Sequence, residues 1–418
     1  MQTETVASLS KNARIVVLLV AFGGLVFDGV ELGLMPIASL SIVKDLAGDV
    51  YTDSMGGKWF ALFTASLMLG AAFGGIWFGA LGDRIGRTRA LAISILFYSI
   101  FNGAGMFVHT LDQMLVLRFL VGLGVGGVWP NGVALVSECW PNVSRPIVSG
   151  VMGAGINFGI LMLSQVARIW HLTAESWRWL FAWSALPALL GIAALMFVPE
   201  SPRWLSMRNT SKGKNTPIVE LCRPPLLRSL IVGIVLGSIP LIGAWAASKW
   251  VIPWADKMGG TTRPDYKAVT QGYWAVGATL GSFFGAQLAS LIGRRFSYFL
   301  ISLGSTVLTC GIFLFSAPLN PEFLLLVFCQ GFVATLFFGW LPLYLPELFP
   351  TRVRATGSGI AYNVGRFATA GGVFVTGSLV ALFGGDFAKV GAAGATIYAL
   401  GMIAIWWAPD TTGKTMDD

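Results

Sequence analysis

Long apolar runs dominate this chain and restrict what it can fold into. A helix needs about 20 apolar residues to cross the hydrocarbon core of a bilayer, and only helices and closed barrels satisfy their backbone hydrogen bonds in lipid. Runs this long and continuous predict helices. Twelve such runs lie at about 14–41, 57–81, 88–108, 112–138, 145–168, 178–198, 228–255, 270–292, 296–316, 321–345, 354–383 and 388–408. The sequence therefore predicts an all-α membrane protein with twelve transmembrane helices.

A second feature is a pattern of five residues that occurs twice, 209 positions apart, which is half the length of the chain. The first copy is Glu138, Pro141, Arg145, Ser149 and Gly150, and the second is Glu347, Pro350, Arg354, Ser358 and Gly359. Internal repeats indicate duplicated structural units. In a membrane protein, two related halves place the binding site between them. We expect two pseudo-symmetric six-helix bundles, residues 1–198 and 228–418, joined by a polar cytoplasmic linker at 199–227.

The charge balance follows the same topology. Charged residues make up 11% of the chain, far below the soluble average of about 25%, and the net charge is +8. Most basic residues fall in segments that lie inside if both termini are cytoplasmic, as the positive-inside rule requires. The charge thus indicates topology rather than a nucleic-acid partner. The four Cys and two His residues lack metal-ligand spacing, so we expect neither a metal nor a cofactor.

Two acidic residues lie deep in the first predicted helix. Asp28 and Glu31 are about 21 and 25 Å from its inner end at the helical rise, and their spacing puts both carboxylates on one face. An ionised acid at this depth costs about 2.5–3.5 kcal/mol unless it lines a cavity. Two neighbouring acids also disfavour double ionisation, which makes them candidates for carrying a proton. The alternative is a structural pair that holds the helix to a neighbour.

Arg366 is the candidate for binding an anion. It lies about 18 Å from the inner end of the eleventh predicted helix, and we find no other basic residue as deep in the apolar helices of the second half. A guanidinium can bind a carboxylate with two hydrogen bonds. The alternative is a permanent salt bridge to Asp28 or Glu31. We interpret Arg118 differently, as a packing or snorkelling residue near the outer interface.

Weaker candidates for substrate contact are polar or aromatic side chains within other helices. Asn131 follows Pro130 in mid-helix, where the proline frees backbone groups. The others are Gln271, Trp340 and Tyr344.

Charged residues at the cytoplasmic rim form a third group. Asp83 and Arg87 lie between the second and third helices. The acidic and basic residues of the two copies of the duplicated pattern also lie at the cytoplasmic rim. We interpret all of them as gate residues rather than substrate ligands: Asp83, Arg87, Glu138, Arg145, Glu347 and Arg354.

The loop that contains Asp83 carries a resemblance to a known family. Residues 79–89 read Gly-Ala-Leu-Gly-Asp-Arg-Ile-Gly-Arg-Thr-Arg, and a partial copy follows the eighth helix with Ser290 in place of the acid. The pattern resembles the signature of the major facilitator superfamily. Residues 28–31, Asp-Gly-Val-Glu, are similar to the D-G-x-D of its aromatic acid:proton symporters. Residues 199–204, Pro-Glu-Ser-Pro-Arg-Trp, are shared with its sugar, organic-ion and nicotinate carriers. The resemblance implies that the Asp83 loop contacts the second half and closes the cytoplasmic side.

The expected function is secondary active transport of a small organic anion, an aromatic or other monocarboxylate, with protons. We see no ATP-binding loop, and we do not expect an enzyme. Three alternatives stay open: a carrier of organic cations or drugs, a sugar carrier, and a non-transporting membrane receptor. The remaining expectations are a monomer in a bacterial inner membrane, with substrate, protons and lipid as its partners.

Overall fold

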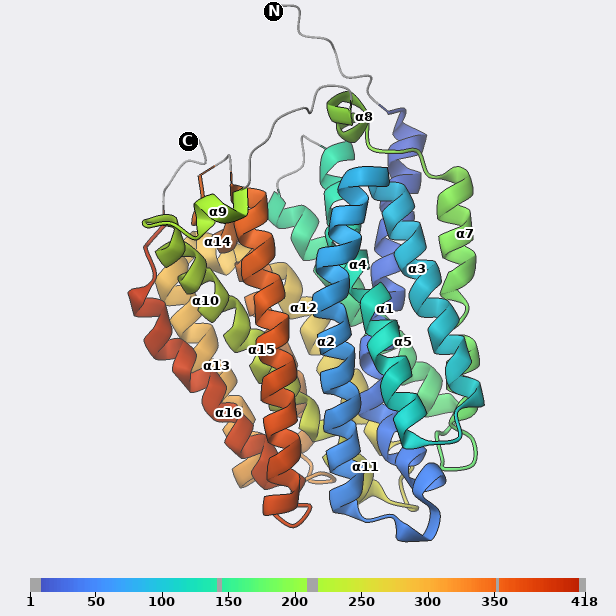
Figure 1. The fold of residues 1–418 in the computed structure, drawn as a ribbon. Helices are drawn as coiled ribbons and strands as arrows, with labels where there is room; N and C mark the ends of the chain where they lie inside the picture. Colours follow the sequence, from blue (N-terminus) through green and yellow to red (C-terminus); the bar gives the residue numbers. More distant parts are fainter. Residues whose placement is uncertain (1–8, 141–144, 209–216, 351–352, 413–418) are drawn as a thin grey trace, which may run out of the picture.

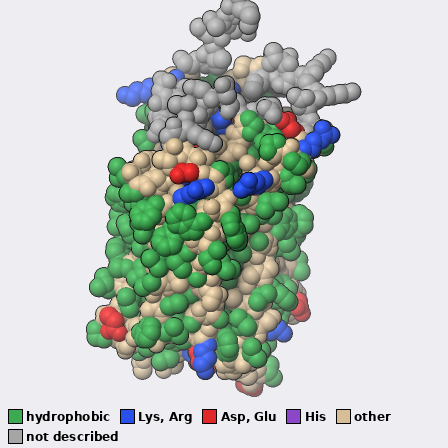
Figure 2. Space-filling model, turned by 90° about the vertical axis from the view of Figure 1, so that its left-hand side faces the viewer, with side chains coloured by type: hydrophobic (Ala, Val, Ile, Leu, Met, Phe, Trp, Pro, Cys, Tyr) green, Lys and Arg blue, Asp and Glu red, His purple; other side chains and the backbone are tan. Residues whose placement is uncertain are grey.

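The computed structural model describes residues 9–140, 145–208, 217–350 and 353–412. In this part of the chain, twelve helices are long and apolar enough to cross a membrane. The predicted fold class is therefore confirmed. Figure 1 shows the helices as two bundles that stand side by side, and Figure 2 shows hydrophobic side chains covering the middle of one face, with charged side chains towards its two ends.

The first bundle contains α1 to α7. Their bounds are α1 (Lys11–Ala47), α2 (Asp53–Ile85), α3 (Arg87–Ala104), α4 (Leu111–Cys139), α5 (Arg145–Ile169), α6 (Arg178–Trp183) and α7 (Pro187–Phe197). The helices α6 and α7 together form the sixth span. A proline begins α7, where its missing N–H group costs no helical hydrogen bond.

The second bundle contains α10 to α16. Their bounds are α10 (Leu226–Ala246), α11 (Val251–Gly259), α12 (Tyr266–Ile292), α13 (Arg294–Phe315), α14 (Phe323–Glu347), α15 (Arg354–Leu382) and α16 (Phe387–Ala404). The seventh span is interrupted between α10 and α11 by a short 3-10 helix, Ser248–Trp250. Pro253 in the first turn of α11 has no N–H group to donate to the carbonyl of Lys249, which favours a break there.

The linker carries two short helices, α8 (Pro202–Arg208) and α9 (Pro217–Leu221). Its polar composition predicts a solvated connector, but α8 packs on the first bundle. Trp204 is buried, and its indole N–H donates to the carbonyl of Asp83 at 2.9 Å. Part of the linker is therefore anchored at the rim of the first half.

The two bundles meet along α2 with α15 and along α5 with α12. Within the first bundle, α1 and α5 approach so closely that backbone meets backbone at Gly29. A Cβ atom there would lie 1.8 Å from the carbonyl oxygen of Ile156. Glycine at this position allows the close packing of small residues that membrane helices use.

Gly29→Ala should therefore lower the free energy of unfolding by about 1–3 kcal/mol, the usual range for overpacking. The matched control is Gly371→Ala in α15, where a Cβ would meet no atom within 4 Å and alanine favours the helix by up to about 1 kcal/mol. Thermal unfolding of the purified protein in detergent measures both changes. Equal melting temperatures for the two variants would contradict the packing at Gly29.

Candidate functional site

The two acids of α1 have different partners. Glu31 is 1% exposed and forms an ion pair with Arg118 of α4, and it accepts a hydrogen bond from Asn102 of α3. Asn102 also accepts a hydrogen bond from Arg118 at 2.5 Å. Glu31 is therefore part of a buried polar network inside the first bundle.

The interpretation of Arg118 as a snorkelling residue is wrong, whereas its burial agrees with a packing role. Its side chain is 0% exposed, and it lies about 10 Å along α4 from Leu111 at the helical rise. Hydropathy gives the depth of a residue but not the direction of its side chain. Charged side chains inside a membrane are usually paired with one another. Applied to Arg118, this rule would have predicted an acidic partner, and Glu31 is that partner.

Asp28 is buried, at 2% exposure, but its carboxylate is less well satisfied. Its Oδ1 atom has no hydrogen-bond partner among the described residues. The charged group that acts on it most strongly is Arg366 of the opposite bundle, followed by Glu31. Asp28 therefore lies within electrostatic reach of a basic residue across the boundary between the halves.

Arg366 lies on α15 and is half-buried. Its Nη1 donates to the carbonyl of Ala71 on α2 at 3.1 Å, and its guanidinium lies 5.3 Å from the centre of the Tyr362 ring. The side chain thus reaches across the interface of the two bundles. It is not the only deep basic residue of the second half, as the sequence reasoning assumed. Lys249, at the break between α10 and α11, is 2% exposed.

Two amide side chains predicted to contact substrate lie in different surroundings. Asn131 is buried and donates to the carbonyls of Phe78 and Gly127 at 3.0 and 2.9 Å, so its amide joins α2 to α4. Gln271 on α12 is 0% exposed, and neither atom of its amide has a hydrogen-bond partner in the described chain. It faces α1, since its Nε2 lies 3.1 Å from the position of a Cβ on Gly33.

Trp340 and Tyr344 form a packed aromatic pair in the second bundle, with ring centres 4.4 Å apart. The indole of Trp340 donates to the carbonyl of Arg294 at 2.9 Å, and the Tyr344 hydroxyl donates to the carbonyl of Pro409 at 2.6 Å. Arg294 begins α13 and Pro409 follows α16, both at the cytoplasmic end. The structure therefore does not bring this pair to Asp28 or Arg366, and packing accounts for both side chains.

The cytoplasmic charges of the first half pair with each other. Arg87 lies 2.6 Å from Asp83 and 3.5 Å from Glu138. Glu138 also accepts a hydrogen bond from Ser201, just before α8. The side-chain ion pair of Asp83 that the structure describes is thus within its own bundle.

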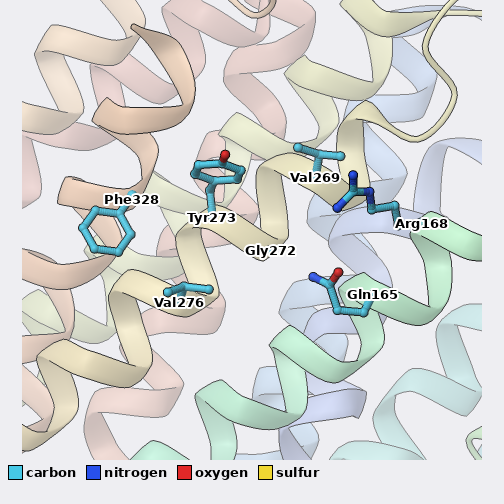
Figure 3. A pocket seen from close by; sticks show the side chains of 7 residues that line it. All are labelled: Gln165, Arg168, Val269, Gly272, Tyr273, Val276 and Phe328. Atoms are coloured by element: carbon cyan, nitrogen blue, oxygen red, sulfur yellow. The ribbon is translucent and has the colours of Figure 1, made fainter.

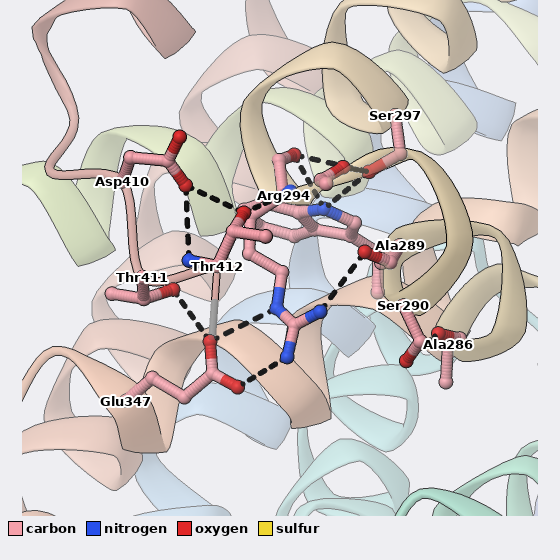
Figure 4. A network of polar contacts seen from close by, with 11 residues as sticks. Ala286, Ala289, Ser290, Arg294, Ser297, Glu347, Asp410, Thr411 and Thr412 are labelled. Carbon is pink, nitrogen blue, oxygen red and sulfur yellow. Dashed lines mark hydrogen bonds and ion pairs between the residues drawn. The ribbon is translucent and has the colours of Figure 1, made fainter. Parts of the chain in front are cut away.

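The second half repeats this arrangement (Figure 4). Glu347 binds Arg294 through two hydrogen bonds of 3.2 and 2.8 Å and accepts a third from Thr411 at 2.5 Å. Ser201 and Thr411 are equivalent, because Pro-Glu-Ser at 199–201 recurs as Pro-Asp-Thr at 409–411. The duplicated pattern therefore marks two equivalent rim clusters, and this third repeated segment escaped the sequence reasoning.

Two further charged residues of the second half form hydrogen bonds at the cytoplasmic rim. The hydroxyl and backbone N–H of Thr412 donate to Asp410 and lower the pKa of its carboxyl group. Arg354 donates to the carbonyls of Pro346 and Phe349. Pro141 and the side chain of Arg145 lie outside the described residues.

The polar contacts that the structure describes between the halves lie at mid-membrane or towards the extracellular end. Two are at mid-membrane, Arg366 with Ala71 and Asn157 with Ser282. Two are further out: Lys257 with Asp53 at 2.9 Å, and Lys267 with Ser41 at 3.0 Å. This arrangement closes the extracellular side.

Lys257→Ala should therefore favour opening of the extracellular side. A partly exposed ion pair is worth up to about 1 kcal/mol, which corresponds to a population shift of up to about fivefold. A cysteine at Thr64, which is buried one turn from Phe60 on the face of α2 that meets the second half, would report the opening. In a background without the native cysteines, its labelling rate by an impermeant thiol reagent should rise.

The control for this experiment is Lys389→Ala, whose ion pair with Asp386 lies within one half. Its labelling rate should match that of the parent. An unchanged rate in Lys257→Ala would rule out a gating role for the Lys257 pair.

One surface groove, of about 310 Å³, lies between α5, α12 and α14 (Figure 3). It is lined by Gln165, Arg168, Val269, Gly272, Tyr273, Val276 and Phe328. None of the predicted site residues lines it. We therefore place the candidate site at the Asp28 and Arg366 boundary instead.

Comparison with known proteins gives a consistent result. The sequence pattern of the Major Facilitator Superfamily matches residues 20–373. The cis,cis-muconate transport protein of Acinetobacter baylyi is 30% identical over 360 residues, 84% of each chain. The 4-hydroxybenzoate transporter of the same organism is 27% identical over 348 residues, 74% of this chain and 75% of the relative. A partially occluded inward-open structure of the xylose transporter from E. coli has a TM-score of 0.74 at 19% identity, covering 97% of this chain and 100% of that chain. The likeness to the xylose transporter shows the fold alone.

Proposed function

The chain belongs to the Major Facilitator Superfamily of secondary transporters, and we propose that it moves a small organic anion, an aromatic or other monocarboxylate, together with protons. The relatives that transport muconate and 4-hydroxybenzoate support an organic anion as the substrate, and 4-hydroxybenzoate is an aromatic monocarboxylate. Both relatives are bacterial, which supports a place in a bacterial inner membrane. We also propose that the transporter acts as a monomer.

One observation carries the proposal: a buried acid of the first half lies within electrostatic reach of a basic residue of the second half. Asp28 has an oxygen without a hydrogen-bond partner in the described chain, and Arg366 is the charge that acts on it most strongly. When Asp28 is ionised, it serves as the counter-charge of Arg366. When Asp28 binds a proton, that counter-charge is lost, and the guanidinium is free to bind a substrate carboxylate.

This exchange of partners couples the two ligands. A carboxylate and an ionised Asp28 compete for Arg366, so substrate binding favours the protonated acid, and protonation favours substrate binding. Such linkage is reciprocal by thermodynamic necessity. Proton and anion would therefore move together.

Glu31 has a related role in the proposal. As the buried counter-charge of Arg118, it holds α1 against α4, and a proton on Glu31 would release that contact. We assign proton loading first to Asp28 and then to Glu31. One proton with a monoanion carries no net charge, whereas each additional proton would gain about 2.3 kcal/mol per 100 mV of membrane potential.

The Arg366→Lys variant tests the substrate contact. Lysine keeps the charge but loses the planar pair of donors, so the affinity for carboxylates should fall by about tenfold to a hundredfold, the worth of a charge-assisted hydrogen bond. The measurement is the concentration dependence of 4-hydroxybenzoate uptake into proteoliposomes with an imposed inward proton gradient. The melting temperature should change little.

Arg228→Lys, at an exposed position near the start of α10, is the matched control and should leave the affinity unchanged. Equal affinities in Arg366→Lys and the parent would remove Arg366 from the site. Uptake of organic cations or sugars without uptake of any carboxylate would favour the rival carriers. Ligand binding without any uptake would favour a receptor.

A further inference from the structure

The break in the seventh span places a lysine in the interior of the second bundle. Lys249 lies in the 3-10 turn between α10 and α11. Discontinuous helices in transporters line the sites of their substrates and coupling ions. Trp250 and the 9 residues of α11 separate Lys249 from the outer end of the span, which places it about 15 Å below that end at the helical rise.

The ammonium group of Lys249 is buried without a polar partner. The residue is 2% exposed, and its Nζ has no hydrogen-bond partner among the described residues. Its contacts are aromatic: Nζ lies 3.3 Å from the ring centre of Trp274 and 6.0 Å from that of Trp245. A cation–π contact offsets only part of the cost of burying an ammonium group.

Further unsatisfied donors lie on the neighbouring residues. Gln271 lies one turn before Trp274 on α12, and neither atom of its amide has a hydrogen-bond partner in the described chain. The hydroxyl of Thr270 also has no hydrogen-bond partner there. The indole N–H of Trp250, next to Lys249, is also without a partner there. Gln271 faces Gly33 of α1, so this group borders the first bundle two residues beyond Glu31.

The buried ionisable groups leave one basic group without an acidic counterpart among the described residues. Glu31 is paired with Arg118, and Asp28 is the acid that faces Arg366. Lys249 remains. Buried ions are paired or hydrogen-bonded when a site is complete, and one carboxylate would complete this one.

We propose that Lys249 and Gln271 form a second carboxylate-binding site, on the extracellular side of Arg366, which receives the substrate anion when the extracellular side opens. Arg366 is half-buried and Lys249 almost fully buried in the present arrangement, which is closed on the extracellular side. The carboxylate would then pass from Lys249 to Arg366 as the protein changes state. This inference rests on the proposed function and adds to it a place where the anion first binds.

The test uses the purified full-length chain and the variants Lys249→Met, Lys249→Arg and Lys267→Met. Lys267 is a buried lysine that does have partners, Asp256 at 3.1 Å and Ser41. Without ligand, Lys267→Met should lower the melting temperature, because Asp256 loses its counter-charge. Lys249→Met should keep or raise the melting temperature, because an unpaired buried charge is removed.

The second measurement is thermal stabilisation by benzoate, 4-hydroxybenzoate and nicotinate. Carboxylates that stabilise the parent should bind Lys249→Met about tenfold to a hundredfold more weakly, and Lys249→Arg should recover most of the affinity. If carboxylates stabilise the parent and Lys249→Met equally, this inference is wrong and the proposed function stands. The same holds if Lys249→Met lowers the melting temperature in the absence of ligand while Lys267→Met does not. If none of the three carboxylates stabilises the parent, both fall.

Discussion

Replacing Arg118 with methionine should destabilise the chain by about 3–5 kcal/mol, because it leaves the Glu31 carboxylate buried without its counter-charge. Methionine fills a similar length, so the loss is electrostatic rather than a cavity. Asn102 alone would remain as a hydrogen-bond donor to Glu31. The expected result is a large fall in the melting temperature of the purified protein, or no folded protein in the membrane.

A second variant distinguishes the electrostatic contribution of the ion pair to stability from the contribution of side-chain packing. The double variant Glu31→Gln, Arg118→Met removes both charges, and replacing a buried pair by neutral groups is often close to neutral. It should therefore recover most of the lost stability. A single Arg118→Met variant as stable as the parent, or a double variant as unstable as the single one, would contradict the buried pair.

Asp28→Asn should abolish proton-driven accumulation of organic anions while leaving exchange of substrate across the membrane. The amide has the size of the acid but cannot bind and release a proton, and it removes the negative charge that faces Arg366. In proteoliposomes with an imposed inward proton gradient, the ratio of internal to external 4-hydroxybenzoate should fall to about one, the equilibrium value without coupling. Counterflow of labelled substrate should persist.

Asp112→Asn, at an exposed position in the first turn of α4, is the control and should accumulate substrate like the parent. Accumulation by Asp28→Asn at the level of the parent would show that the proton is carried elsewhere. Glu31 would then be the next residue to test.

Much of the fold could be predicted because a bilayer restricts the chain so strongly. Apolar runs of spanning length report helices directly, and the duplicated Glu138 and Glu347 patterns report two halves. The rim clusters follow the repeat as well, since Arg87 with Glu138 and Arg294 with Glu347 are equivalent pairs. The resemblance of the Asp83 loop to the superfamily is confirmed by the family match.

The partners of the buried charges could not be predicted in the same way. Hydropathy places Arg118 and Lys249 within apolar runs but does not give the direction of their side chains, and each contact joins residues far apart in the sequence. The break at Lys249 was hidden because the run from 228 to 255 stays apolar across it. Trp340 and Tyr344 show a related difficulty, since aromatic side chains that pack in a bundle have the same sequence appearance as those that line a site.

The central claim is that an organic anion and a proton cross together through the Asp28 and Arg366 boundary. The most direct measurement is the internal pH of proteoliposomes that contain the purified protein and a trapped pH-sensitive dye. Adding external 4-hydroxybenzoate without an imposed gradient should acidify the interior in the parent and not in Asp28→Asn. Uptake of labelled 4-hydroxybenzoate by the parent with no change in internal pH would contradict the account.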